Sequence, residues 1–419
     1  MAFSRAYMQL RPIIVALGRH KVATMLIVLQ VALTLAVTSN ALFIVATRIV
    51  HQSRATGTDE AHLFVIRNKW TIGQSTTLIH ADIRTDLHAL RHVAGVRDAF
   101  SSNDFPLAGY GESGISTRLK VKPDQAKRPQ FAMVYAADVH AIDTLGVSLI
   151  AGRNFRPDEV GSIGPDGTLA SPDIIITRSL ARKLFPDGHA LGKTVYLPGG
   201  PTTIIGIVDR LQGPLSVTRS SDGDSVLVPA HYIDPAGVVY LIRTAPKAAM
   251  GPVITAALRA LQSRSGLRII DPERGIVTMS EARAHAYATD RNVSLLMSIL
   301  SGMLLLATAG GIVGLSSFWV SQRRRQIGIR RSLGASSGDI LRYFHVENFL
   351  IVSGGIFPGV VLAVLANLGL MKAFYPMNRM PLSIPLLGAL LLWVLGQLAV
   401  WGPARHAARV PPVVAIRAD

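Results

Sequence analysis

The sequence has no cysteine among its 419 residues. This absence excludes disulfide bonds, metal sites built on thiolates and cysteine nucleophiles. It also removes one indication of whether the protein works in an oxidising or a reducing compartment.

Charged residues are missing from four long stretches of the chain. No Asp, Glu, Lys or Arg occurs in residues 22–47, 292–322, 348–371 and 380–404, which are 26, 31, 24 and 25 residues long. Each stretch exceeds the roughly 20 apolar residues that a helix needs to cross a hydrocarbon core about 30 Å thick. One such stretch could be a buried helix of a soluble protein, but four in one chain predict four transmembrane helices.

The basic residues predict how these helices are oriented. The segments before the first stretch, between the second and third, and after the fourth together hold 13 basic and 3 acidic residues, which is +10 of the net charge of +17. Because basic residues concentrate in cytoplasmic segments, we expect residues 1–21, 323–347 and 405–419 to be cytoplasmic, with both termini inside. Membrane topology then explains the basic excess without a nucleic-acid partner.

The first apolar stretch resembles a secretory signal in its basic flank and in its small, polar residues Thr38, Ser39 and Asn40. A cleaved signal has an apolar region of roughly 7 to 15 residues, so we expect this longer stretch to be a retained anchor. The link at residues 372–379 then forms a short external loop between the third and fourth helices.

Residues 48–291 lie outside the membrane in this topology, and they suffice for one large domain or two small ones. Strand-like runs alternate with helix-like runs, and Gly and Pro clusters at residues 161–167 and 197–201 indicate loops. Strands are predicted at residues 63–67, 131–137, 173–177, 202–208, 226–229 and 238–244, and helices at residues 85–92, 178–184 and 252–263. The predicted fold class is a membrane protein with four transmembrane α-helices and a large α+β extracytoplasmic domain between the first and second.

One pattern approaches a nucleotide-binding motif without completing it. Residues 188–194 read G-x-x-x-G-K-T, one residue short of a phosphate-binding loop, with Asp187 where the first glycine belongs. An aspartate there would repel the phosphate that the backbone amides of such a loop bind. We therefore interpret the segment as a turn.

Two further patterns are also incomplete. His88 and His92 have the spacing of metal ligands on a helix, but the apolar face of that helix places them on the solvent side. Ser113 is not the serine of a G-x-S-x-G elbow, because Ile115 replaces the second glycine. The sequence thus predicts no catalytic, cofactor-binding or metal site.

Glycine pairs mark two of the predicted transmembrane helices. Gly310 and Gly314 form G-x-x-x-G in the second helix, and Gly355 and Gly359 repeat it in the third. Small residues at this spacing let helices approach closely within lipid. Packing within the chain and contact with a second subunit are both open interpretations. Pro358 is expected to bend the third helix.

The cytoplasmic segment between the second and third helices holds a compact pattern. Residues 323–335 read RRRQIGIRRSLGA. Ile327, Ile329 and Leu333 predict an apolar ridge, and the glycines permit a close approach and a turn. The S-x-x-D pattern that follows predicts a capping box at the start of the next helix. We expect a short helix lying across the membrane surface.

Residues 323–335 resemble the short cytoplasmic signature, usually close to RRREIGIRRALGA, of the permease family that includes FtsX, the lipoprotein-releasing permeases and the macrolide exporter MacB. In the external segment, residues 149–155 are similar to the L-x-x-G-R-x-F of MacB-type periplasmic domains, and residues 173–193 and 204–208 resemble segments that follow it there. Residues 403–416 are similar to the closing pattern of the family. The resemblance spans nearly the whole chain.

The resemblance implies a non-enzymatic permease subunit of an ATP-binding-cassette (ABC) export complex in a bacterial cytoplasmic membrane. A separate ABC ATPase subunit would hydrolyse ATP, and a second permease copy or paralogue would complete a dimer. The ATPases would drive the external domain by mechanotransmission through the second helix. That domain would have two subdomains, one split in sequence around the other. Membrane lipid surrounds such a complex, and a periplasmic adaptor is open as a further partner.

In the family, the short cytoplasmic helix couples the permease to its ATPase by docking in a groove of the latter. The resemblance assigns this role to Gln326, Ile327, Gly328, Ile329, Arg330, Leu333, Gly334 and Ala335. Gln326 replaces the usual glutamate of the family, so an amide hydrogen bond would replace a charge-assisted contact.

Other functions are open at this point. An FtsX-like regulator uses ATP-driven motion to activate a cell-wall hydrolase, but its external domain is usually smaller than residues 48–291. A lipoprotein-releasing permease is a second alternative. A membrane-anchored extracytoplasmic enzyme is a third, and the sequence offers no catalytic residues for it.

Overall fold

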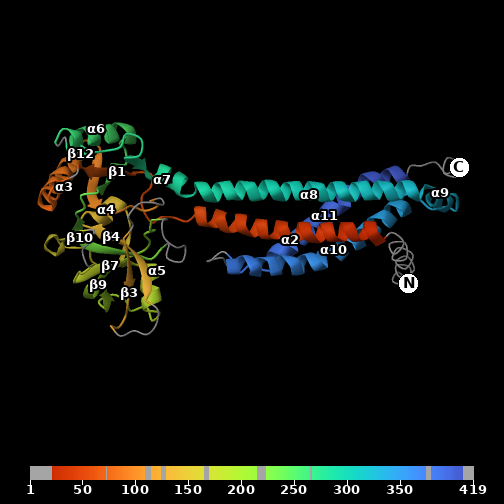
Figure 1. The fold of residues 1–419 in the computed structure, drawn as a ribbon, viewed down its shortest axis with the longest axis horizontal. Coiled ribbons are helices and arrows are strands. Elements are labelled where there is room, and N and C mark those ends of the chain that lie inside the picture. Colours follow the sequence, from red (N-terminus) through yellow and green to blue (C-terminus); the bar gives the residue numbers. More distant parts are fainter. Residues whose placement is uncertain are drawn as a thin grey trace. The chain divides into compact units, whose positions relative to one another are not determined.

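The chain divides into two compact units, a helical unit made of Met1–Ser53 and Thr289–Asp419 and an α+β domain made of Arg54–Ala288 (Figure 1). The structure is a computed structural model. It describes residues 21–71, 73–108, 115–123, 129–164, 169–214, 223–264, 267–373 and 379–408.

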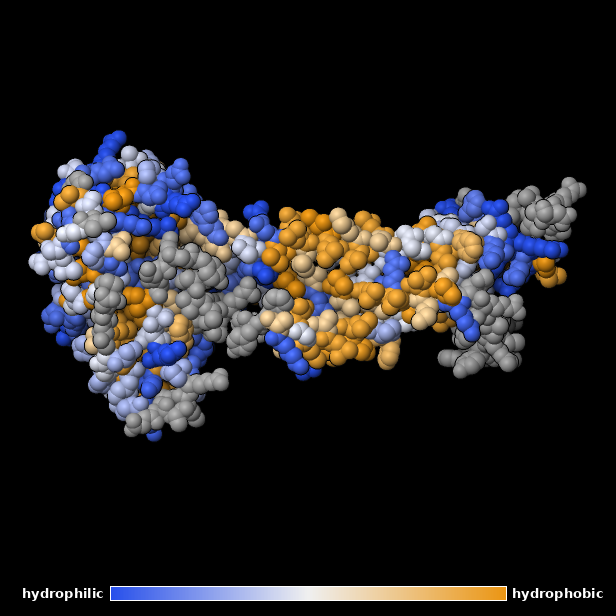
Figure 2. All heavy atoms as spheres, viewed as in Figure 1, coloured by the Kyte–Doolittle hydropathy of each residue, from blue (hydrophilic) through white to orange (hydrophobic). Residues whose placement is uncertain are grey.

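Four helices long and apolar enough to cross a membrane form the helical unit. They are α2 (Lys21–Gln52), α8 (Ala288–Gln322), α10 (Ser337–Ala373) and α11 (Ser383–Ala408). Large apolar side chains point outward from them, and Leu306, Phe357 and Leu398 are 75, 78 and 68% exposed. Figure 2 shows a hydrophobic belt over the helical unit. An apolar surface of this extent needs lipid around it, which confirms the predicted class of membrane protein with four spans.

Helices α2 and α10 pack in parallel at close range. Asn40 Nδ2 donates a hydrogen bond to the Ala363 carbonyl oxygen at 3.0 Å. Nearer the N-terminal end of both helices, a Cβ on Gly355 would lie 2.7 Å from Val31 Cβ. Because the residue numbers rise together along the contact, α2 and α10 begin at the same end of the bundle. Pro358 lies inside α10, which continues through it.

Helix α8 runs antiparallel to α2. The Thr34 and Thr308 hydroxyls are 2.8 Å apart, and Arg48 near the end of α2 pairs with Asp290 near the start of α8. Helix α11 returns beside α10, where Trp393 Nε1 donates to Ser353 Oγ at 3.1 Å. The start of α2, the end of α8 and the start of α10 therefore lie at one end of the unit.

The first sheet of the α+β domain is antiparallel, in the order β12-β1-β11-β2 with β13 also paired to β1. Its strands are β1 (Leu63–Trp70), β2 (Val96–Ser102), β11 (Val238–Thr244), β12 (Arg268–Ile269) and β13 (Ile276–Thr278). Alternation along β1 sends Phe64 and Ile66 toward the helices α3 (Thr76–Arg91) and α6 (Met250–Gln262), whereas Leu63 and Val65 face a second core.

A buried charge network fastens α3 to this sheet. Asp86 and Arg268 are 1% and 3% exposed and form a bidentate ion pair at 2.8 and 2.9 Å. The Tyr240 hydroxyl donates to Asp86 at 2.6 Å, and burial together with this carboxylate raises the tyrosine pKa well above its usual range. Asp86 is thus a structural residue of the core.

The second sheet is mixed, in the order β3-β4-β10-β7-β9-β5, with β6 on β10 and β8 on β9. Its strands are β3 (Ser116–Leu119), β4 (Gln130–Ala137), β5 (Leu149–Gly152), β6 (Gly161–Ile163), β7 (Asp173–Thr177), β8 (Thr194–Leu197), β9 (Gly200–Val208) and β10 (Ser225–Tyr232). Helix α5 (Arg178–Leu184) packs on it through Leu180 and Leu184. The remaining short helices are α4 (Ala141–Leu145), the 3-10 turn η1 (Pro157–Glu159) and α7 (Met279–Ala286).

The strands of the first sheet flank those of the second in the sequence, and a shared core joins the two sheets. Leu63 and Val65 of β1 meet Tyr135 of β4 and Ile175 of β7 in this core. The domain therefore consists of two layered parts, the first split in sequence around the second.

The predicted ends of α3 were wrong. The helix begins at Thr76 rather than at residue 85, because Ser75 caps it by accepting a hydrogen bond from the Leu78 amide at 3.3 Å. By contrast, β7, β11 and α5 have the predicted bounds.

Candidate functional site

A short helix, α9 (Arg324–Ser332), connects α8 to α10. It ends because Gly334 adopts a left-handed backbone with φ of 96°. Ser336 then caps α10, since its Oγ accepts from the Asp339 amide at 3.2 Å while the Asp339 carboxylate accepts from the Ser336 amide at 3.0 Å. The turn and the cap fix where α9 stops and how the chain enters the third span.

The two faces of α9 differ in burial. Ile327 is only 7% exposed and packs in a core with Ile340 and Phe344, and Gly328 is buried beside it. Ile329 is 47% exposed and Leu333 82% exposed. The three apolar residues expected to form one ridge are thus divided between an inner and an outer face.

The outer face of α9 combines apolar and polar groups. Ile329 and Leu333 are four residues apart and therefore lie on one side of the helix. Gln326 and Arg330 are exposed as well. The Arg330 guanidinium lies 5.0 Å from the centre of the Tyr343 ring, a cation–π distance that holds it against α10. Gly334 and Ala335 lie in the turn beyond this face.

A buried ion pair holds the junction of α8 and α9. Arg323 Nη1 lies 3.0 Å from Glu347 Oε1 of α10, and their side chains are 11% and 2% exposed. The same Nη1 donates to the Tyr343 hydroxyl at 3.3 Å. Breaking such a pair leaves a buried charge without its partner, which is unfavourable. The pair therefore resists separation of α8 from α10.

Sequence reasoning missed this pair. The charge pattern places both Arg323 and Glu347 in the cytoplasmic segment at residues 323–347 and does not pair them. The available signal was that Glu347 directly precedes a stretch of 24 residues without charge. A carboxylate at that position needs a cation beside it.

The glycine pairs of the two G-x-x-x-G patterns have different surroundings. Cβ atoms on Gly355 and Gly359 would lie 2.7 Å from Val31 and 3.0 Å from Leu35 of α2. At Gly310 and Gly314, a Cβ atom would meet no heavy atom of the described residues within 4 Å outside the local helix backbone. Gly355 and Gly359 are therefore sites of helix packing within the chain, whereas Gly310 and Gly314 leave open space along α8.

Residues 188–194 form a turn between α5 and β8. The Gly192 amide donates to the Ile204 carbonyl oxygen at 2.8 Å and the Lys193 amide to that of Ala190 at 3.2 Å. The first of these bonds reaches strand β9 and the second closes the turn, so both amides are engaged, and a strand follows Lys193 instead of the helix that a phosphate-binding loop requires.

The histidine pattern forms no metal cluster. His88 and His92 are exposed, with ring centres 4.3 Å apart. Within the described residues, no group of three or more His, Cys, Asp or Glu side chains could hold a metal ion. Ser113 and the closing residues Pro412, Val413 and Ile416 lie outside the described residues.

Comparison with known proteins matches the chain to two family models. The FtsX-like permease C-terminal family matches residues 298–412, and the MacB-like periplasmic core domain matches residues 25–260. The second match covers more than half of the chain. The chain therefore belongs to the MacB/FtsX-type permeases of ABC transporters.

Two curated relatives illustrate the similarity. The macrolide export ATP-binding/permease protein MacB 1/2 of Paracoccus denitrificans is 27% identical over 356 residues, which cover 82% of this chain and 48% of that protein. The ABC transporter permease YknZ of Bacillus subtilis is 25% identical over 341 residues, which cover 77% of this chain and 80% of that protein. The chain spans about half the length of the MacB relatives it matches.

A solved structure, the periplasmic region of MacB from Actinobacillus actinomycetemcomitans, is 14% identical with a TM-score of 0.33 and covers 54% of this chain and 91% of that one.

Proposed function

We propose that the chain is the permease subunit of an ABC export complex and that an ATPase on a partner subunit docks on the outer face of α9. The observation that carries this proposal is the exposed pair Ile329 and Leu333, 47% and 82% exposed, outside the membrane-spanning helices. Exposed apolar side chains of this size are typical of protein interfaces when polar groups surround them. Gln326 and Arg330 supply such polar groups.

The proposed topology puts α9 in the cytoplasm of a bacterial cell. The end of the helical unit that holds Lys21 and α9 also holds the end of α11, because Ser337 Oγ donates to the Ala408 carbonyl oxygen at 3.1 Å. The sequence segments at this end carry 13 basic and 3 acidic residues. Under the positive-inside rule, these segments and both termini are cytoplasmic, and the α+β domain is periplasmic.

The contacts of α9 support mechanotransmission. An ATPase that moves the outer face of α9 would pull on the inner face, where Ile327 packs in the helical core, and on Arg323, which pairs with Glu347. Helix α8 continues from this junction for 35 residues, or about 50 Å. Motion at α9 would therefore reach the end of α8 that connects to the α+β domain in the sequence.

The proposal includes two partners. The amides of Gly192 and Lys193 are already engaged, which supports the proposal that a separate ATPase subunit hydrolyses ATP. The open space beside Gly310 and Gly314 suits a close approach by a second permease copy. The MacB-like match over residues 25–260 favours export over an FtsX-like regulatory role.

The test replaces the exposed apolar pair by acids. The full chain is affinity-purified in mild detergent, the co-purifying ATPase is identified by its phosphate-binding loop, and the two are then reconstituted. Ile329→Asp with Leu333→Asp should weaken ATPase binding by about tenfold or more, as loss of an interface hot spot does, and should abolish export. Both residues are exposed, so the variant should insert and fold.

The matched control is Leu78→Asp, which changes a 60% exposed helical leucine in the α+β domain. It should bind the ATPase as the wild type does. ATPase binding and export at wild-type levels in the α9 variant would contradict the proposed docking role.

A further inference from the structure

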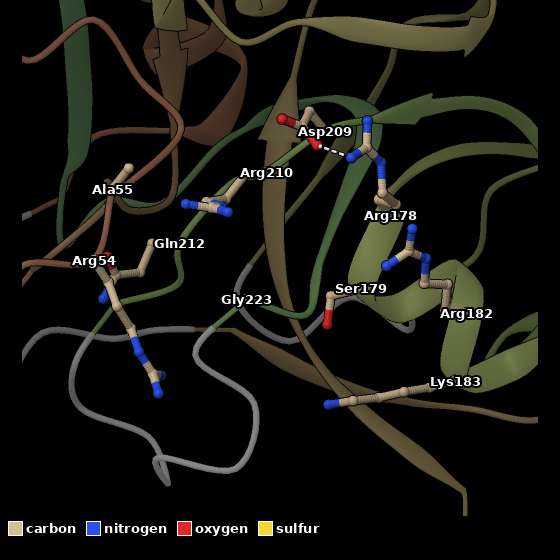
Figure 3. A pocket seen from close by; sticks show the side chains of 10 residues that line it. All are labelled: Arg54, Ala55, Arg178, Ser179, Arg182, Lys183, Asp209, Arg210, Gln212 and Gly223. Atoms are coloured by element: carbon tan, nitrogen blue, oxygen red, sulfur yellow. Dashed lines mark ion pairs between the residues drawn. The ribbon is translucent and has the colours of Figure 1, made fainter. Parts of the chain in front are cut away.

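Basic side chains gather around a cavity of about 650 Å³ in the α+β domain. The five basic residues that line it come from three segments of the chain and surround a common space in Figure 3. They are Arg54, Arg178, Arg182, Lys183 and Arg210. This volume is typical of sites for small molecules.

Backbone contacts hold two of the three segments together. The Gln212 amide donates to the Thr56 carbonyl oxygen at 2.8 Å, which joins the segment of Arg54 to that of Arg210. Gly57 has a φ of 89°, and a Cβ there would lie 2.1 Å from the Arg210 carbonyl oxygen. Only glycine permits this approach, so the positions of Arg54 and Arg210 are fixed by the fold.

Side-chain contacts fasten the third segment, helix α5. Arg178 Nη1 lies 2.9 Å from Asp209 Oδ1, and Ser179 Oγ donates to Asp224 Oδ1 at 2.7 Å. Asp224 is 3% exposed and also pairs with Lys183. The cavity is therefore lined by elements that are already in place without a ligand.

Among the described lining residues of the cavity, positive charge exceeds negative charge. Among the described residues that line the cavity, Asp209 is the single carboxylate, and it pairs with Arg178. Lys183 pairs with Asp224. In the described part of the chain, no carboxylate pairs with Arg182 or Arg210, and both side chains are exposed. Two guanidinium groups thus face the cavity with their hydrogen-bond donors available to a ligand.

We propose that this cavity binds a phosphate group of a small molecule or of a lipid headgroup. A planar guanidinium donates two parallel hydrogen bonds to a phosphate, and four of the five basic residues are arginines. The Ser179 side chain adds a polar group at the edge of the cavity (Figure 3). The volume leaves room for the remainder of a phosphate-bearing molecule. This site lies in the α+β domain and is independent of the α9 docking proposal.

The test uses the full chain purified in dodecyl maltoside and free of phosphate buffer. Calorimetric titrations with inorganic pyrophosphate and with short-chain phosphatidic acid distinguish the two sources. Binding of pyrophosphate indicates a soluble phosphorylated ligand, and binding of phosphatidic acid alone indicates a lipid headgroup. Either binding should weaken as the salt concentration rises.

Variants connect the binding to the cavity. Arg182→Gln with Arg210→Gln should weaken binding by about tenfold or more, because hydrogen bonds between charged groups are lost. Arg259→Gln, an exposed arginine of α6, removes a charge elsewhere on the domain and should bind as the wild type does. Asp209→Asn removes the competing carboxylate and should tighten binding, a result that misfolding cannot produce. No binding of either probe, or equal affinity in the wild type and the double variant, would overturn the proposal.

Discussion

Replacing Gly355 by leucine tests the close pairing of α10 with α2. The Cβ that Gly355 lacks would lie 2.7 Å from Val31 Cβ and 2.8 Å from the Val28 carbonyl oxygen. Carbon atoms pack best at about 3.5–4.0 Å, so the two helices would have to separate by about 1 Å for the first carbon alone. Overpacking of this kind lowers the free energy of unfolding by about 1–3 kcal/mol.

The assay is unfolding of the purified full chain in mixed micelles with increasing amounts of sodium dodecyl sulfate, followed by tryptophan fluorescence. Trp393 of α11 stacks on Phe349 of α10 with ring centres 5.5 Å apart, so it reports on the bundle. Gly310→Leu is the matched control, since a Cβ there would meet no atom of another described helix within 4 Å. It should leave the unfolding of the monomer unchanged and reduce the fraction of cross-linked dimer.

Two results would refute this reasoning. If Gly355→Leu has the same free energy of unfolding as the wild type, α2 and α10 are not in close contact. An equal loss of stability in Gly310→Leu would show that α8 packs against its own chain at this glycine, and the proposed subunit contact would be withdrawn.

The remaining predictions concern topology and acidity. Because the chain has no native cysteine, Ser263→Cys in the α+β domain should react with an impermeant thiol reagent in spheroplasts and Ser332→Cys of α9 only after lysis; the reverse would refute the orientation. Burial opposes ionisation of Glu60, but hydrogen bonds from Arg283 and Thr56 outweigh it and lower its pKa below the ordinary 4.5. A lowered carboxylate pKa contributes stability that is present above the ordinary value and is lost as the pH falls through the folded value. Thermal melting of the full chain can be followed by circular dichroism between about pH 3 and pH 7. As the pH falls, the melting temperature of Glu60→Gln should decrease less than that of the wild type. The same pH dependence in both proteins would contradict this role of Glu60.

The membrane-spanning helices were predictable because lipid excludes charge over a length set by the bilayer. Strands β7 and β11 were also predictable, because each contains a continuous apolar run bounded by polar residues. Strand β2 (Val96–Ser102) was missed because its polar residues interrupt the apolar pattern, although Ala99–Ser102 are buried. The two-residue strand β12 has no pattern of its own and exists because it pairs with β1.

The position of the candidate site in the sequence was predictable, but the orientation of its side chains was not. The residue pattern located α9 and its stop at Gly334, since both depend on local backbone preferences. It did not predict that Ile327 turns inward while Ile329 and Leu333 turn outward, because the direction of a short helix depends on the helices it packs against. The pair of Arg323 with Glu347 joins residues 24 positions apart, so the sequence could indicate that Glu347 needs a cation but not which arginine supplies it.

Ion pairs hold helix α8 near both of its ends. The pair of Arg48 with Asp290 ties one end to α2, and the pair of Arg323 with Glu347 ties the other end to α10. Between these ties, the Thr308 hydroxyl lies 2.8 Å from that of Thr34 of α2 and Ile312 packs in the helical core, so α8 is held along its length as well as near its ends. If an ATPase docks on α9 as proposed, we expect its push to reach α2 and α10 as well as α8, because these contacts join the three helices.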